Sequence, residues 1–300
     1  MKIVLVSAFS DRIAALRYDY AAQAKDWPVA CNLCGVRGHA VEVASRDRYG
    51  YPATFVVCRC CGLGYLCPRL SPTQYAHFYA DIYRPLVSAY HGRRIDAETV
   101  QLEQHGYATA LAAFVLPLLP SPPRTILDVG GSTGVVASVL ATGLNTRATV
   151  LDPSPDELAV AHANGMETIT GFVEDFDPGE RRWDLVLLCQ TIDHLLDVRG
   201  TLAGLRQMTA PSGRAFVDIV DIDVLLRRTG SIETVIKIDH PYYLTRATAV
   251  ALFALTGFTI VAERLSADGH RGFVLAPGSY RQPDWTTLEF IAARFLAAVT

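Results

Sequence analysis

Residues 124–140 read RTILDVGGSTGVVASVL, and this stretch decides the fold class of the chain. An apolar strand pattern leads into a glycine-rich turn, and an apolar helix pattern follows. Further strand patterns occur at residues 148–155, 166–171, 183–190, 213–220, 258–265 and 271–277, with helix patterns at about 199–209 and 245–256. Strands that alternate with helices predict an α/β domain with a doubly wound, mostly parallel (Rossmann-like) sheet.

The turn DVGGSTG, residues 128–134, lies where such a sheet binds its ligand, at the carboxyl end of a strand. Gly130 and Gly134 allow the backbone to approach a ligand closely. Asp152 ends the second strand, where its carboxylate is placed to accept hydrogen bonds from ribose hydroxyls. The glycine spacing differs from the G-x-G-x-x-G of dinucleotide sites.

Six of the seven cysteines fall within residues 31–67, which indicates a metal site. Two C-x2-C pairs are separated by 23 residues, the spacing of a zinc ribbon that is completed by four thiolates. The expected ligands are Cys31, Cys34, Cys58 and Cys61. Four thiolates leave no open coordination position, so this zinc is expected to be structural.

Glycines follow both cysteine pairs, at Gly35 and Gly62, where the turn needs a positive φ. Cys60 does not fit the spacing of the pairs. Cys67 and Cys189 are expected to pack as small apolar residues.

Residues 71–85, SPTQYAHFYADIYRP, carry a helix-start signal, with Ser71 as N-cap and an aromatic stripe that lies on one face. Pro85 is expected to end or kink this helix. Most of the stripe is expected to be core. Tyr79 and Tyr83 carry hydroxyls that need partners when buried, so a substrate pocket remains open for them.

The D-x-G-x-x-x-G turn, VLDPSP (150–155), GFVEDF (171–176) and the turn PSG (211–213) together resemble class I S-adenosylmethionine-dependent methyltransferases, over about residues 105–277. The resemblance extends upstream through the cysteine pairs and CGLGYLCPRLSPTQYAHFY (61–79), and it includes DHLLD (193–197) and DHPYYLT (239–245). With these motifs the chain is similar to bacterial sugar and natural-product C-methyltransferases that have an N-terminal zinc module.

The resemblance implies that S-adenosyl-L-methionine is the cofactor. The positions it assigns to the cofactor are Asp128, Gly130, Gly131, Gly134, Asp152, Pro153, Asp175, Phe176 and Gln190. Asp128, Gly130 and Gln190 would line the methionine part. Asp175, with Phe172 or Phe176, would meet the adenine. Ser132 stands where many relatives have a middle glycine.

Methyl transfer to a weakly acidic acceptor needs a base that works near neutral pH, and histidine suits that task. His194, beside Asp193, follows the fourth strand of the domain and is the first candidate. His240 lies in a segment, residues 221–244, that is expected to form a lid. Tyr79 and Tyr83 match the aromatic helix of the related enzymes and could bound the substrate.

Composition limits the class of protein. The chain has 300 residues, is 50% hydrophobic and has a formal net charge of −3, so no strong field for nucleic acid or membrane is implied. Neither a signal peptide nor a membrane span is expected, and we expect a soluble, cytoplasmic protein.

The chain is expected to have five divisions. They are an N-terminal segment (1–27), a zinc module (28–70), a helical connector (71–120), the methyltransferase domain (121–280) and a C-terminal helix (281–300).

The leading hypothesis is methyl transfer, by C- or O-methylation, to a small molecule such as a sugar, polysaccharide or natural-product intermediate. An RNA base methyltransferase is an alternative, because residues 28–70 carry five arginines against two acids. The lack of a dense basic stripe argues against nucleic acid. A non-catalytic interaction protein is a third reading, which the acids at Asp128 and Asp152 oppose. The sequence does not determine the oligomeric state.

Overall fold

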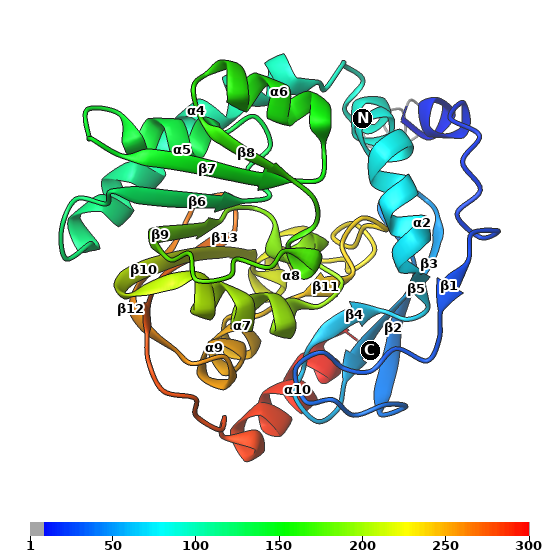
Figure 1. Cartoon of the computed structure of the whole chain (residues 1–300). Coiled ribbons are helices and arrows are strands. Elements are labelled where there is room, and N and C mark those ends of the chain that lie inside the picture. Colours follow the sequence, from blue (N-terminus) through cyan, green and yellow to red (C-terminus); the bar gives the residue numbers. More distant parts are fainter. Residues whose placement is uncertain (1–8, 300) are drawn as a thin grey trace. The chain divides into compact units, whose positions relative to one another are not determined.

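The computed structural model describes residues 9–299, which form two compact units (Figure 1). The first unit contains the described part of residues 1–96, together with 222–245 and 285–299. The second unit contains residues 97–221 and 246–284. Residues 1–8, at the start of the expected N-terminal segment, lie outside the described residues. No helix in the described part of the chain is long and apolar enough to cross a membrane.

The second unit is built on one seven-stranded sheet with the order β12-β13-β10-β9-β6-β7-β8. Its strands are β6 (Thr125–Val129), β7 (Arg147–Asp152), β8 (Glu167–Thr170), β9 (Trp183–Leu188), β10 (Thr209–Val220), β12 (Phe258–Leu265) and β13 (His270–Pro277). The neighbours from β8 to β10 pair in parallel, and β13 pairs antiparallel with β10 and β12. The expected mostly parallel α/β sheet is confirmed.

Helices cover both faces of this sheet (Figure 1). One face carries α4 (Ala97–Val115), α5 (Val135–Ala141) and α6 (Pro155–Ala163), and the other carries α7 (Val198–Met208) and α9 (Arg246–Leu255). The apolar face of α4 packs on α5, and Leu111, Val115 and Leu140 are fully buried there. This burial removes apolar surface from water and fixes the strand ends that carry the site. Short 3₁₀ turns, η2 (Leu116–Leu118), η3 (Val173–Asp175) and η4 (Ile192–His194), complete the unit.

The first unit has a four-stranded antiparallel sheet with the order β11-β4-β3-β2. Its strands are β2 (Ala40–Arg46), β3 (Pro52–Cys58), β4 (Gly64–Leu66) and β11 (Tyr242–Tyr243). A separate two-stranded sheet pairs β1 (Lys25–Asp26) antiparallel with β5 (Arg69–Leu70). The unit also contains α8 (Ile222–Thr229) and α10 (Trp285–Val299), and α10 contacts β2 and β3. The segment expected to be a lid thus supplies an edge strand, β11, which pairs with β4.

The aromatic helix is longer than expected. It begins at the N-cap Ser71, whose hydroxyl accepts from the Gln74 N–H, and runs through α2 (Pro72–His77), a π-helical turn η1 (Phe78–Ile82) and α3 (Tyr83–His91). Of the two outcomes expected for Pro85, a helix end or a kink, the helix end is wrong. The wide π turn directly before it accommodates a residue that has no N–H, and the helix continues to a left-handed cap at Gly92.

Candidate functional site

In the second unit, the glycine turn lies at the carboxyl edge of the sheet. Strands β6, β7 and β9 are parallel neighbours, so the residues that follow them meet at one edge. Asp128 is near the end of β6, Asp152 ends β7, and Gln190 follows β9. The sheet therefore places Asp128, Asp152 and Gln190, three residues expected to hold the cofactor, at one edge.

The glycines of this turn are required by close packing. Gly130 has a φ of +66°, and a Cβ there would come within 2.6 Å of the Thr191 side chain. Gly134 has a φ of +75° and opens α5, and a Cβ there would come within 2.5 Å of Met166 Cε. A side chain at either position would strain the backbone and also displace a neighbour.

The carboxylate of Asp152 holds the turn in place. Its Oδ2 accepts from the Ser132 N–H at 2.9 Å, and its Oδ1 accepts from the Ser154 N–H at 2.8 Å. Ser132, which replaces a middle glycine, adopts a φ of +53°. The strand-end acid thus fixes the backbone on both sides of the expected ribose position.

The turn also contains polar atoms that lack partners. Asp128 Oδ1, Ser132 Oγ and Thr133 Oγ1 are buried and have no hydrogen-bond partner among the described residues. Burial raises the pKa of Asp128 to about 7, and the negative charge of Asp152 adds to the effect. Buried polar atoms without partners are rare in folded proteins. Their presence in a glycine turn fits a polar ligand such as S-adenosylmethionine.

Three further residues fix Gln190, and sequence reasoning missed them. Gln190 has a φ of +52°, and its N–H donates to Asp218 Oδ1 at 2.6 Å. The Tyr107 hydroxyl donates to Asp218 Oδ2 at 2.7 Å, and Gln190 Nε2 lies 3.3 Å from His270 Nδ1. Burial raises the pKa of Asp218. An acid within the apolar strand GRAFVDIV was the available signal for Asp218, whereas no local pattern marked Tyr107.

The remaining expected residues of this unit lie in short turns. Asp193 is buried and His194 is half-buried in η4, which begins directly after Thr191, the residue packed against Gly130. Asp175 is exposed in η3. The ring of Phe176 packs against Trp183, which begins β9 at the end of that strand opposite Gln190. Pro153 is half-buried next to Asp152.

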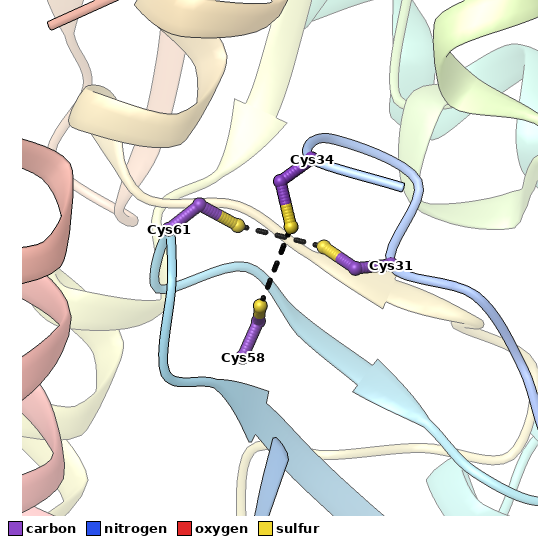
Figure 2. A group of neighbouring side chains, drawn as sticks. All are labelled: Cys31, Cys34, Cys58 and Cys61. Atoms are coloured by element: carbon purple, nitrogen blue, oxygen red, sulfur yellow. Dashed lines mark hydrogen bonds between the residues drawn. The ribbon is translucent and has the colours of Figure 1, made fainter. Parts of the chain in front are cut away.

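In the first unit, the four expected metal ligands converge on one point (Figure 2). Their sulfur atoms all lie within 4.8 Å of one another, with Cys31 and Cys61 at 3.4 Å and Cys34 and Cys58 at 3.6 Å. Zn–S bonds of about 2.3 Å in a tetrahedron place sulfurs about 3.8 Å apart. The donor set and its spacing therefore fit a tetrahedral ion. Hydrogen bonds with the Cys31 thiol lower the pKa of Cys34, and they lower that of Cys58 to about 7.

The two cysteine pairs have the same backbone hydrogen bonds. The Gly35 N–H donates to Cys31 O at 2.8 Å, and the Gly62 N–H donates to Cys58 O at 2.9 Å. The N–H groups of Cys31 and Cys58 donate to the carbonyl oxygens of Val36 and Leu63, both at 3.0 Å. Both glycines have a positive φ, 79° and 77°. The remaining cysteines, Cys60, Cys67 and Cys189, are half-buried and form no disulfide.

A second cluster of the first unit joins the aromatic helix to the DHPYYLT segment. The rings of Tyr75, Tyr79 and Tyr83 follow one another along the helix with centroids 4.9 Å apart at each step, the first pair edge-to-face and the second tilted. The hydroxyls of Tyr75 and Tyr79 donate to the carbonyl oxygen of Asp239, at 3.0 and 3.4 Å. Burial raises the pKa of Tyr79 well above its usual value, so its phenol is neutral.

Asp239 and His240 are the acidic and basic members of this cluster. Asp239 Oδ2 lies 3.5 Å from His240 Nε2 and 3.7 Å from Lys237 Nζ. The His240 side chain is only 4% exposed and that of Asp239 only 1%. Three of the expected catalytic residues, Tyr79, Tyr83 and His240, thus belong to the first unit, and two, Asp193 and His194, belong to the second. Sequence reasoning did not single out Asp239.

Comparison with known proteins agrees with these features. A family model described as a methyltransferase domain matches residues 102–263, which is more than half of the chain. A ubiquinone biosynthesis O-methyltransferase of Methylobacterium sp. (strain 4-46) is 31% identical over 116 residues, 35% of this chain. The matched region spans 45% of that relative's length.

Solved structures share the fold. The PH0226 protein from Pyrococcus horikoshii OT3 has a TM-score of 0.51 at 19% identity, covering 58% of this chain and 91% of its own. The magnesium protoporphyrin IX methyltransferase from Synechocystis PCC 6803, solved with bound S-adenosylhomocysteine, has a TM-score of 0.52 at 12% identity, covering 69% and 100%. With its α/β sheet, its glycine turn and this family match, the chain belongs to the S-adenosylmethionine-dependent methyltransferases.

Proposed function

We propose that the protein transfers a methyl group from S-adenosyl-L-methionine to a small-molecule acceptor of sugar, polysaccharide or natural-product biosynthesis, on carbon or oxygen. The observation that carries this proposal is the glycine turn with its three buried polar atoms that lack partners in the described chain, Asp128 Oδ1, Ser132 Oγ and Thr133 Oγ1. A bound sulfonium compound supplies an electrophilic methyl group. The seven free cysteines suit a reducing compartment, so we place the enzyme in the cytoplasm.

The chain's own residues bind and orient the cofactor. Asp152 accepts from the ribose hydroxyls, and its hold on the Ser132 N–H keeps the turn in shape. Gly130, Gly131 and Gly134 let neighbouring side chains pack directly against the turn and hold its shape. Gln190, held by Asp218, faces the methionine part. For the adenine we favour Asp175 with Phe172, because the ring of Phe176 is engaged by Trp183.

His240 is our first candidate for the base that accepts the acceptor's proton. Its imidazole is buried, and the Asp239 carboxylate 3.5 Å from Nε2 stabilises the imidazolium that forms when the proton arrives. The hydroxyls of Tyr79 and Tyr83 bound the acceptor. His194, with Asp193, is the alternative base. A pair of variants, His240→Asn and His194→Asn, separates the two, because loss of the base lowers turnover by about 100-fold or more while cofactor affinity stays the same.

We also propose that Cys31, Cys34, Cys58 and Cys61 hold a structural Zn²⁺. The convergence of four sulfurs and the matching backbone hydrogen bonds of the two pairs support it. With four thiolates around the ion no position is left for a substrate. The ion's part is to stabilise the module that carries the aromatic helix.

Calorimetric titration of the full chain with S-adenosylhomocysteine tests the function. We expect one binding site per chain, and we expect Asp152→Asn to weaken binding by about 10- to 100-fold, because a charge-assisted hydrogen bond contributes about 1.5–3 kcal/mol. Asp156→Asn, an exposed acid at the start of α6, is the matched control and should bind like the wild type. Absence of binding by the wild type would overturn the proposal, and unchanged affinity in Asp152→Asn would overturn the ribose assignment.

A further inference from the structure

Arg48 occupies a fixed position at the tip of the hairpin between β2 and β3. The backbone N–H of Arg48 donates to Ile236 O at 2.9 Å. The preceding residue, Asp47, is buried, and its carboxylate accepts from the N–H groups of Tyr49, Tyr51 and Ile238 at 3.0, 2.9 and 3.0 Å. The hairpin tip is therefore tied to the segment that leads into Asp239 and His240.

The guanidinium of Arg48 lacks the partner that a buried cation normally has. It lies over the ring of Tyr90, 4.2 Å from the centroid, and near the ring of Tyr49 at 5.8 Å. Its Nε is buried without a hydrogen-bond partner, and no carboxylate in the described part of the chain pairs with it within 4.0 Å. Buried charges are costly unless they are paired, so this half-buried arginine, which contacts Tyr49 and Tyr90 but pairs with no carboxylate in the described chain, has room for an external anion.

The same residues connect Arg48 to the cluster of Asp239, Tyr79 and Tyr83. Arg48 and Asp47 form hydrogen bonds with the backbone of Ile236 and Ile238, within three residues of Asp239, and the charge of Asp239 acts on Arg48 from beyond ion-pair distance. The carboxylate of Asp239 is already shared by Lys237 and His240. Arg48 is thus an additional positive group beside the residues that we assign to the acceptor.

We propose that Arg48 binds an oxyanion, a carboxylate or a phosphate group, carried by the methyl acceptor. This inference rests on the proposed function, since it takes the Asp239–His240 cluster as the acceptor site. The planar guanidinium presents a fork of N–H donors that matches two oxygens of either anion. The rings of Tyr49 and Tyr90 hold that fork in place before the acceptor arrives and lower the entropy lost on binding.

The test uses the full chain saturated with S-adenosylhomocysteine. Inorganic phosphate, pyrophosphate and succinate are titrated separately by calorimetry at constant ionic strength set with chloride. We expect at least one of these anions to bind the wild type, and the anion that binds identifies phosphate or carboxylate as the group on the acceptor. Arg48→Met should lower that affinity by about 10- to 100-fold, as expected for loss of a charged hydrogen bond.

Two further variants show whether a loss of anion binding comes from the Arg48 guanidinium itself. They distinguish it from a loss of folding and from a loss of positive charge anywhere on the hairpin. Arg48→Lys keeps the charge but loses the fork, so it should fold and still bind the anion more weakly than the wild type. Arg46→Met removes the neighbouring exposed arginine, which donates to Gly50 O, and should bind the anion normally. If no anion binds, or if Arg46→Met and Arg48→Met lose affinity equally, or if Arg48→Lys binds like the wild type, the inference is wrong. Failure to bind S-adenosylhomocysteine at all would instead refute the proposed function.

Discussion

The cysteine cluster of the first unit and the glycine turn of the second unit both place glycines in the left-handed backbone region, but for opposite purposes. Gly35 and Gly62 turn the chain so that side chains, four thiols, converge on one point. Gly130 and Gly134 have no side chain of their own, and the side chains of Thr191 and Met166 pack against them instead. The cluster should therefore fail when a side chain is lost, and the turn should fail when one is gained.

The largest effect is expected for Cys58→Ser, which removes one of the four thiols. Structural zinc sites contribute about 10–16 kcal/mol of binding free energy to folding, so loss of a ligand should unfold much of the first unit. Elemental analysis should find about one zinc per chain in the wild type and almost none in the variant, and circular dichroism should show lost strand signal. Cys60→Ser, the adjacent cysteine outside the cluster, is the control. Full zinc content in Cys58→Ser would contradict the assignment of the ligands.

A smaller effect is expected for Gly134→Ala. The alanine would have to keep the left-handed φ of Gly134, at a cost of about 1–2 kcal/mol. Its Cβ would also come within 2.5 Å of Met166 Cε, and such overpacking costs about 1–3 kcal/mol more. Gly143→Ala is a matched control, because its φ of +73° is nearly the same while no atom lies within 4 Å of its Cβ. Urea unfolding should show a larger loss of stability in Gly134→Ala. Equal losses in the two variants would mean that the turn is not tightly packed.

The smallest effect, when taken per pH unit, concerns the buried acid of the glycine turn. The pKa of Asp128 rises from 3.8 to about 7 in the folded chain, so between these values the folded protein keeps a proton that the unfolded chain has released. Its contribution to stability is therefore present at low pH and is lost as the pH rises toward 7. The unfolding free energy of the wild type should fall, relative to Asp128→Asn, by about 1.4 kcal/mol per pH unit in this window. Urea unfolding at several pH values measures how the unfolding free energy of the wild type and of Asp128→Asn depends on pH. Parallel curves for the two proteins would contradict the raised pKa of Asp128.

Local spacing explains why much of the molecule could be predicted from its sequence. The four cysteines of the cluster lie within two short turns, and the glycine turn joins one strand to the next helix. In both cases the residues that act together are close in the chain, so their pattern is visible. The alternation of strands and helices likewise predicted the parallel sheet.

Long-range pairing set the limits of that prediction. The hydroxyl of Tyr107 donates to Asp218, which lies 111 residues later in the chain. Tyr242 pairs with Tyr65 in the antiparallel sheet, although most of the second unit lies between them in the sequence. Neither contact leaves a periodic signal, because each depends on how distant segments pack. Pro85 shows a different limit, since a helix breaker was accommodated by a π turn whose position depends on the packing of Phe78 and Tyr79.

The strand β11 has a consequence for the time at which the first unit is completed during synthesis. The four cysteines and strands β2 to β4 emerge early, but Tyr242 and Tyr243, which cover the free edge of β4, follow about 180 residues later. At a translation rate of about 5–20 residues per second, that edge stays open for roughly 10–35 s. An unpaired strand edge is a template for association with other chains. The interval between the third strand of this sheet and its fourth is thus when a nascent chain is most exposed to aggregation, and slower synthesis across the second unit would lengthen it.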